Sequence, residues 1–196
     1  DAKSELTEKE IKLLKEWITE GAKWERHWAF TSPKKSPFPD VNDKAWTINE
    51  IDYFILSKLE SLGLKPSGRA GKEQLLRRAS FDLTGLPPRI ADLDDFIKDK
   101  SDEAFENAVD RLLASPGFGE RMALEWLDVA RYGDTDGLFE DHPRSIYPWR
   151  DWVISAFNAN LPYNDFITWQ VSGDLIPDAT NEQKLATGFL RNNPTS

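Results

Sequence analysis

Residues 127–152 read LDVARYGDTDGLFEDHPRSIYPWRDW. This stretch mixes acids, arginines, aromatics and turn residues more densely than the rest of the chain, and it joins two segments with helical spacing of apolar residues. Its central part, residues 133–147, is long for a connection between two helices, and long loops in compact domains are often functional. We call residues 133–147 the acidic loop and expect any functional site to lie there.

Apolar residues recur at helical spacing on both sides of the acidic loop, and no alternating strand pattern of useful length is present. Proline and glycine separate the helical segments, since proline removes a backbone donor and glycine favours a helix end. The predicted fold class is all-α, an irregular multi-helix domain with a detached N-terminal helix. Helices are expected near residues 7–22, 51–62, 71–83, 90–98, 101–113 and 119–132. Three more follow the acidic loop, the first with Pro148 in its first turn.

The chain changes character after its first thirty residues. Thr7 and Glu10 have the spacing of a capping box, which predicts that a helix begins there. An aromatic group follows, made of Trp24, His27, Trp28 and Phe30. Residues 31–47 are rich in proline and have no helical period, so we expect an extended linker. We therefore divide the chain into residues 1–30, a linker over 31–47, and a helical domain over 48–196.

Composition excludes several classes of protein. The formal net charge is -9, whereas general nucleic-acid binding needs a basic face that neutralises phosphates. The chain has no cysteine, which rules out disulfides, thiolate metal sites and covalent haem attachment within these residues. No apolar run approaches the ~18 residues of a membrane-spanning helix. Divalent cations, basic partners and neutral ligands remain compatible with the charge.

Several motifs occur together in the chain: NEIDYFI (49–55), LRRASFDLTGLPP (76–88), LLASP (112–116), GER (119–121), WLDVARY (126–132), WRDWVI (149–154) and ATGFLR (186–191). In this order they closely resemble the uncharacterised cytochrome-associated domain of planctomycete-type exported multidomain proteins. The resemblance covers the chain from about Trp28 onward. It implies that residues 1–30 are the tail of a preceding c-type cytochrome domain, and that 48–196 is a fragment whose family pattern continues beyond the C-terminus.

The resemblance also carries expectations about cofactors, partners and location. Haem c is expected in the upstream cytochrome domain, and no cofactor is expected within this chain. The partners implied are the remaining domains of the same protein, and the location implied is periplasmic or extracellular. The family has no assigned reaction, so the resemblance does not decide whether this domain is an enzyme.

The acidic loop places four carboxylates within eight residues: Asp134, Asp136, Glu140 and Asp141. Calcium prefers oxygen ligands, and Gly137 permits a tight turn, so a calcium site is one interpretation. An EF-hand is excluded, because that register puts Tyr132 and Pro143 at ligand positions. The alternatives are carboxylates paired with arginines and a simple solvated loop.

Arginines flank the acids and offer bidentate forks to carboxylates or to a ligand. The ligand-site interpretation names Arg131, Tyr132, Arg144, Trp149 and Arg150 as binding residues, with Tyr132, Tyr147 or Trp149 as a stacking wall. The ligand would be a sugar, an acid or another small molecule. For an enzyme, the catalytic candidates are Asp136, Asp141 and His142.

Three functional hypotheses follow. The leading one is an accessory ligand- or partner-binding module of an exported, cytochrome-linked multidomain protein. The second is an enzyme domain acting on carbohydrate-like substrates, with metal assistance as an option. The third is a purely structural connector between a cytochrome and a downstream domain.

Overall fold

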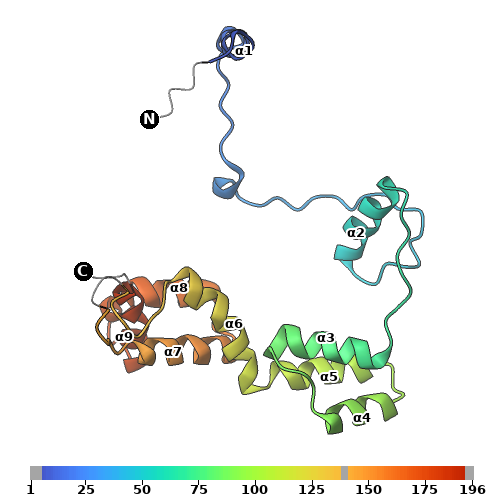
Figure 1. The fold of residues 1–196 in the computed structure, drawn as a ribbon, viewed down its shortest axis with the longest axis vertical. Coiled ribbons are helices and arrows are strands. Elements are labelled where there is room, and N and C mark those ends of the chain that lie inside the picture. Colours follow the sequence, from blue (N-terminus) through green and yellow to red (C-terminus); the bar gives the residue numbers. More distant parts are fainter. Residues whose placement is uncertain (1–5, 138–140, 193–196) are drawn as a thin grey trace. The chain divides into compact units, whose positions relative to one another are not determined.

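The computed structural model describes residues 6–137 and 141–192, and within them the predicted all-α fold is confirmed. The only extended pairing in the described residues is an isolated bridge between Thr135 and Pro143. The α-helices are α1 (Glu8–Thr19), α2 (Glu50–Ser61), α3 (Lys72–Thr84), α4 (Ile90–Lys98), α5 (Ala104–Leu113), α6 (Pro116–Val129), α7 (Tyr147–Asn158), α8 (Tyr163–Ser172) and α9 (Asn181–Ala186) (Figure 1). Short 3-10 helices are η1 (Trp28–Phe30), η2 (Gly173–Leu175) and η3 (Thr187–Arg191).

The chain divides into two compact units, Asp1–Ser67 and Gly68–Ser196. The division falls after α2, whereas the sequence placed the start of the helical domain at residue 48. In the first unit, α1 begins with the predicted capping box, in which Thr7 and Glu10 exchange side-chain and backbone hydrogen bonds. No described residue of α1 is buried.

In the same unit, α2 packs against part of the segment expected to be a linker. The ring of Phe38 stacks on Tyr53 at 5.4 Å, and the backbone N–H of Asn42 donates to the Glu60 carboxylate at 3.0 Å. The buried residue of α2 is Leu56, which is 1% exposed. Helical spacing of the apolar residues predicts a buried stripe that includes Ile51 and Ile55, and this prediction is wrong, because the two side chains are 69% and 50% exposed. The ring of Phe38 contacts both Tyr53 and Phe54 of this helix.

The second unit contains two hydrophobic clusters. One is formed by α3, α4 and α5, and its buried residues are Leu76, Phe96, Ala104 and Ala108. The larger cluster is formed by α6, α7, α8 and α9 with the residue that precedes α7, and its buried members are Ala123, Ile146, Trp149, Trp152, Val153, Ala156, Phe166 and Ala186. Because α6 packs against both α3 and α7, it joins the two clusters. Burial of Trp149, Trp152, Val153 and Ala156 confirms the stripe predicted for the helix after the acidic loop.

The contact between α6 and α7 depends on a glycine. Gly119 is buried, and a Cβ atom placed on it would lie 2.4 Å from the carbonyl oxygen of Ile154. Its N–H donates to the side-chain oxygen of Asn158 at 2.8 Å. This close approach fixes α7 against α6 and thereby the two ends of the acidic loop.

Candidate functional site

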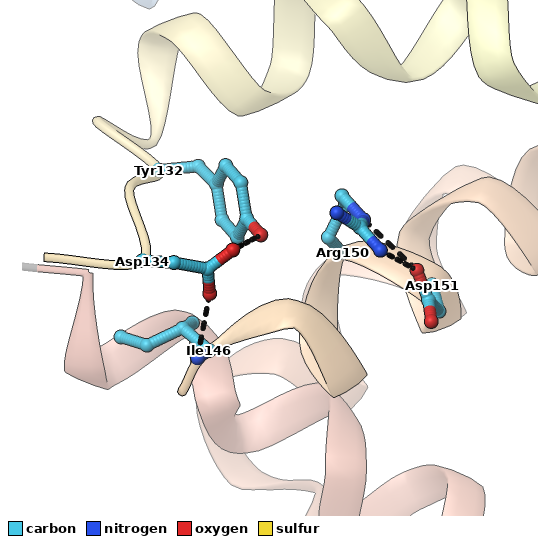
Figure 2. Close-up of polar contacts among 5 residues, drawn as sticks. All are labelled: Tyr132, Asp134, Ile146, Arg150 and Asp151. Atoms are coloured by element: carbon cyan, nitrogen blue, oxygen red, sulfur yellow. Dashed lines mark hydrogen bonds and ion pairs between the residues drawn. The ribbon is translucent and has the colours of Figure 1, made fainter. Parts of the chain in front are cut away.

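The acidic loop is anchored by a carboxylate that serves both of its ends. One oxygen of Asp134 accepts the hydroxyl of Tyr132 at 2.6 Å, and the other accepts the backbone N–H of Ile146 at 2.9 Å (Figure 2). The carbonyl oxygen of Asp134 also accepts the N–H of Arg144 at 2.7 Å. We call Tyr132, Asp134 and Ile146 the Asp134 clamp.

The carboxylate of Asp134 caps helix α7, although Asp134 does not adjoin that helix in the sequence. Ile146 is the N-cap residue of α7, and its own side chain cannot accept a hydrogen bond. The carboxylate of Asp134 satisfies the N–H of Ile146 instead, and a negative charge at this end is favoured by the helix dipole. The first turn of α7 is therefore positioned by a residue twelve positions earlier.

The pKa values of the clamp residues reflect the same contacts. The Tyr132 hydroxyl, with the N–H groups at the start of α7 and Arg150, lowers the pKa of Asp134 below its usual value. Burial first, then the hydrogen bond to Asp134 and the charge of that carboxylate, raise the pKa of Tyr132 to about 12. At neutral pH the pair is thus a neutral hydroxyl donating to a carboxylate, which is the stronger class of hydrogen bond.

The described part of the loop beyond the clamp is a narrow turn. The N–H of Asp136 donates to the carbonyl of His142 at 3.0 Å, and the N–H of Gly137 donates to the Asp141 carboxylate at 2.8 Å. The side chain of Thr135 and this Gly137 N–H lower the pKa of Asp141. Both Asp141 and His142 are exposed at the end of the turn.

The predicted metal ligands and arginines of the acidic loop are only partly brought together in the structure. Asp136 lies 3.8 Å from the Nε atom of Arg144 in a half-buried ion pair. Glu140 lies outside the described residues. Among the residues that are described, no three His, Cys, Asp or Glu side chains are grouped as cation ligands. Arg131 is exposed, and its backbone has a positive φ of 56°.

Two of the predicted ligand residues, Arg150 and Trp149, are engaged in contacts within the protein. Arg150 makes two hydrogen bonds, of 2.9 and 2.7 Å, to one oxygen of the adjacent Asp151 (Figure 2). Trp149 is 2% exposed, and its ring lies 6.1 Å from Tyr132 and 6.0 Å from Phe189. Its ring therefore belongs to the core rather than to an exposed stacking wall.

A surface pocket of about 570 Å³ lies beside the first turns of α7. We call it the α7–α9 pocket. Its lining residues come from α7, the residues that follow it, α8 and α9: Tyr147, Pro148, Asp151, Trp152, Ser155, Ala156, Ala159, Leu161, Trp169, Glu182 and Leu185. Of these, only Tyr147 was singled out in the sequence as part of a binding site.

Three aromatic side chains line this pocket. Tyr147 is half-exposed at the start of α7, whereas Trp152 is only 6% exposed. The ring of Trp152 stacks on Phe166 with centroids 5.4 Å apart and an angle of 12° between planes. Trp169 is partly buried and comes from α8. The aromatic surface is therefore supported by the core, which favours a pre-formed site.

Two carboxylates also line the pocket. Asp151 accepts both hydrogen bonds from Arg150 on Oδ1, so its Oδ2 atom has no hydrogen bond within the described residues. Glu182 lies in the first turn of α9, and its side chain makes no hydrogen bond or ion pair to any described residue. No arginine, lysine or histidine lines the pocket. Its charged lining residues are thus all negative.

A second pocket of about 550 Å³ is lined by residues of α3, α4, α5 and α6. Arg89 holds Asp92 there by two hydrogen bonds of 2.7 and 2.8 Å, and the other charged lining residues are Arg111 and Glu120. The formal charges cancel, and no aromatic ring lines this pocket. It therefore offers neither an excess of one charge nor an aromatic surface to distinguish one class of ligand from another, in contrast to the α7–α9 pocket.

The fold and the clamp define an all-helical domain in which a hydrogen-bonded loop positions the helix beside an aromatic pocket. Residues 50–196 match the model of PSCyt2, described as a protein of unknown function (DUF1549), and the chain belongs to this family. The family's name associates it with cytochromes, which supports the resemblance seen in the motifs. No curated protein and no solved structure matches the chain. None of the described helices is both long and apolar enough to cross a membrane.

Proposed function

We propose that this chain is an accessory ligand-binding module of an exported, cytochrome-linked multidomain protein, and that its ligand binds in the α7–α9 pocket. The observation that carries the proposal is the pocket of about 570 Å³ with three aromatic side chains and two carboxylates. Ligand sites in proteins have volumes of ≈ 300–1,000 Å³, are mostly apolar and contain a few polar groups that orient the ligand.

The acidic loop supports the pocket and contributes only its last residue, Tyr147, to the lining. The Asp134 clamp fixes the N-terminus of α7, and this first turn presents Tyr147 and Asp151 to the pocket. A site held on a positioned helix loses less conformational entropy on binding than one on a mobile loop.

The cytochrome link rests on the family match and on the motifs. The family's name supports an association with cytochromes, and the resemblance of residues 1–30 to a cytochrome tail supports a haem c domain upstream. The proposed partners are the remaining domains of the same protein. Export to the periplasm or the cell exterior is part of the same proposal.

Fluorine NMR tests the ligand-binding function. The chain has eight tryptophans, and incorporation of 5-fluorotryptophan gives each a separate probe. The substitutions Trp152→Phe and Trp169→Phe assign the two pocket resonances. Trp126 is an internal control, because its N–H donates to the side chain of Gln170 at 2.9 Å in the core.

A panel of cationic, anionic and neutral small molecules and of oligosaccharides is then added. We expect at least one class to shift the resonances of Trp152 and Trp169 in a saturable manner, while that of Trp126 stays in place. If no member of the panel shifts either pocket resonance, the ligand-binding function is wrong, and the structural connector becomes the better hypothesis.

A further inference from the structure

We propose that the ligand of the α7–α9 pocket is an organic cation with an apolar body. An ammonium or guanidinium head would lie near Asp151 and Glu182, and the apolar body would lie against the aromatic lining. This inference rests on the proposed function, because it names the chemical class that the same pocket selects.

The charged side chains of the pocket favour a cation. Asp151 and Glu182 are the charged residues that line the pocket, and both are acidic. The guanidinium of Arg150 is held at Oδ1 of Asp151, which leaves Oδ2 available to a second cation. Lys184 follows closely on α9 but lines a different pocket. An anionic ligand would meet repulsion from both carboxylates, whereas a cation would be attracted.

The aromatic rings of the pocket also favour a cation. Trp152, Trp169 and Tyr147 line the same pocket as the carboxylates. The face of an aromatic ring carries partial negative charge and attracts cations, most strongly for tryptophan. Rings and carboxylates therefore favour the same ligand charge, and the rings also offer apolar area to the body of the ligand.

The electrostatic field of the whole chain attracts cations as well. The formal net charge of -9 raises the local concentration of cations around the molecule. This field alone does not select a site, so the test separates it from the local effect of the pocket. Variants that remove one negative charge inside or outside the pocket make that separation.

The test compares three probes with the same ring and different charge: benzyltrimethylammonium, benzyl alcohol and benzenesulfonate. Each is titrated into the fluorotryptophan-labelled chain while the Trp169 resonance is followed. We expect the ammonium probe to bind at least about 10-fold more tightly than the alcohol, since it gains cation–π contacts and the attraction of two carboxylates. We expect no saturable shift with the sulfonate.

Charge variants then locate the effect. Glu182→Gln should weaken binding of the ammonium probe by about 3- to 5-fold, which corresponds to the loss of one partly exposed ion pair. Asp174→Asn is the matched control, because it removes one exposed carboxylate from η2, outside the pocket lining. It should leave the affinity unchanged within error. A normal fluorine spectrum of each variant shows that it is folded.

Four outcomes overturn the inference. Equal affinity for the ammonium probe and the alcohol removes the charge argument. An equal loss in Glu182→Gln and Asp174→Asn shows that only the overall field acts. A shift of Trp169 with a neutral oligosaccharide, and none with the ammonium probe, rejects the cation while the ligand-binding function stands. A panel that moves no pocket resonance rejects the inference together with that function.

Discussion

The hydroxyl of Tyr132 donates a hydrogen bond of 2.6 Å to Asp134, whose second carboxylate oxygen accepts the N–H that begins helix α7. The acidic loop therefore contains a structural cap. Both oxygens of Asp134 are used within the protein, so a cation or a ligand at this carboxylate would compete with the start of α7. The ligand chemistry is better placed in the adjacent α7–α9 pocket.

The clamp makes a prediction about stability. Asp134→Ala leaves the N–H of the buried residue Ile146 without its acceptor and should lower the free energy of unfolding by about 1–3 kcal/mol. Asp134→Asn keeps an oxygen acceptor and should cost less. Urea denaturation followed by circular dichroism measures both. Asp174→Asn is the control and should change stability by no more than about 0.5 kcal/mol. Equal stability of the alanine variant and the wild type would contradict the clamp.

The Tyr132 hydroxyl predicts a pH dependence. Its pKa is raised to about 12 in the folded chain, above the unfolded value of about 10. The stabilisation that it contributes is therefore fully present below pH ~10 and is lost as the pH rises through about 12. The wild type should be more stable than Tyr132→Phe by about 1–2 kcal/mol at pH 8, and this difference should shrink above pH ~10. Denaturation of both proteins across this range measures it; a difference that does not change with pH would contradict the assignment.

The contact of α6 with α7 predicts the effect of one methyl group. In Gly119→Ala the new Cβ atom would meet the Ile154 carbonyl oxygen at 2.4 Å, so a backbone must shift. Alanine also favours helix by about 1 kcal/mol, but overpacking in a core costs about 1–3 kcal/mol and should exceed that gain here, because a backbone atom cannot rotate away. Thermal denaturation should show a lower Tm. Gly68→Ala is the control, since its Cβ would meet no atom within 4 Å.

The loop geometry also predicts the response to calcium. A ligand that binds the folded chain raises its stability by RT ln(1 + [L]/Kd), so calcium at about 1 mM raises Tm if the site is tighter than that. Because Asp134 is engaged on both oxygens, we expect Tm to stay constant upon addition of calcium. Magnesium is the control for ionic strength. A rise of several degrees with calcium alone would restore the acidic loop as a metal site.

Local signals in the sequence predicted most helix boundaries. The capping box at Thr7 and Pro148 in the first turn of α7 stand where the sequence placed them. Each depends on backbone chemistry within a few residues. The sequence predicts that α6 begins at residue 119, three residues after its observed start, because Ser115 caps the helix and Pro116 and Gly117, which usually separate helices, lie in its first turn.

The candidate site was only partly predictable, because its contacts connect distant residues. The density of acids and arginines marked the acidic loop, but spacing alone does not show that Asp134 pairs with Tyr132 and with Ile146. Trp169 and Glu182 come from α8 and α9 and carry no local motif. The pocket exists only when three helices pack, so no single stretch of sequence indicates it.

The most direct test of the account is a crystal structure of the chain soaked with 4-bromobenzyltrimethylammonium, with the bromine located by anomalous scattering. We predict a bromine peak in the α7–α9 pocket, the ammonium group near Glu182 and Asp151, and Asp134 still bonded to Tyr132 and Ile146. A peak outside that pocket, or the ammonium group bound at Asp134 with the clamp broken, would contradict the account.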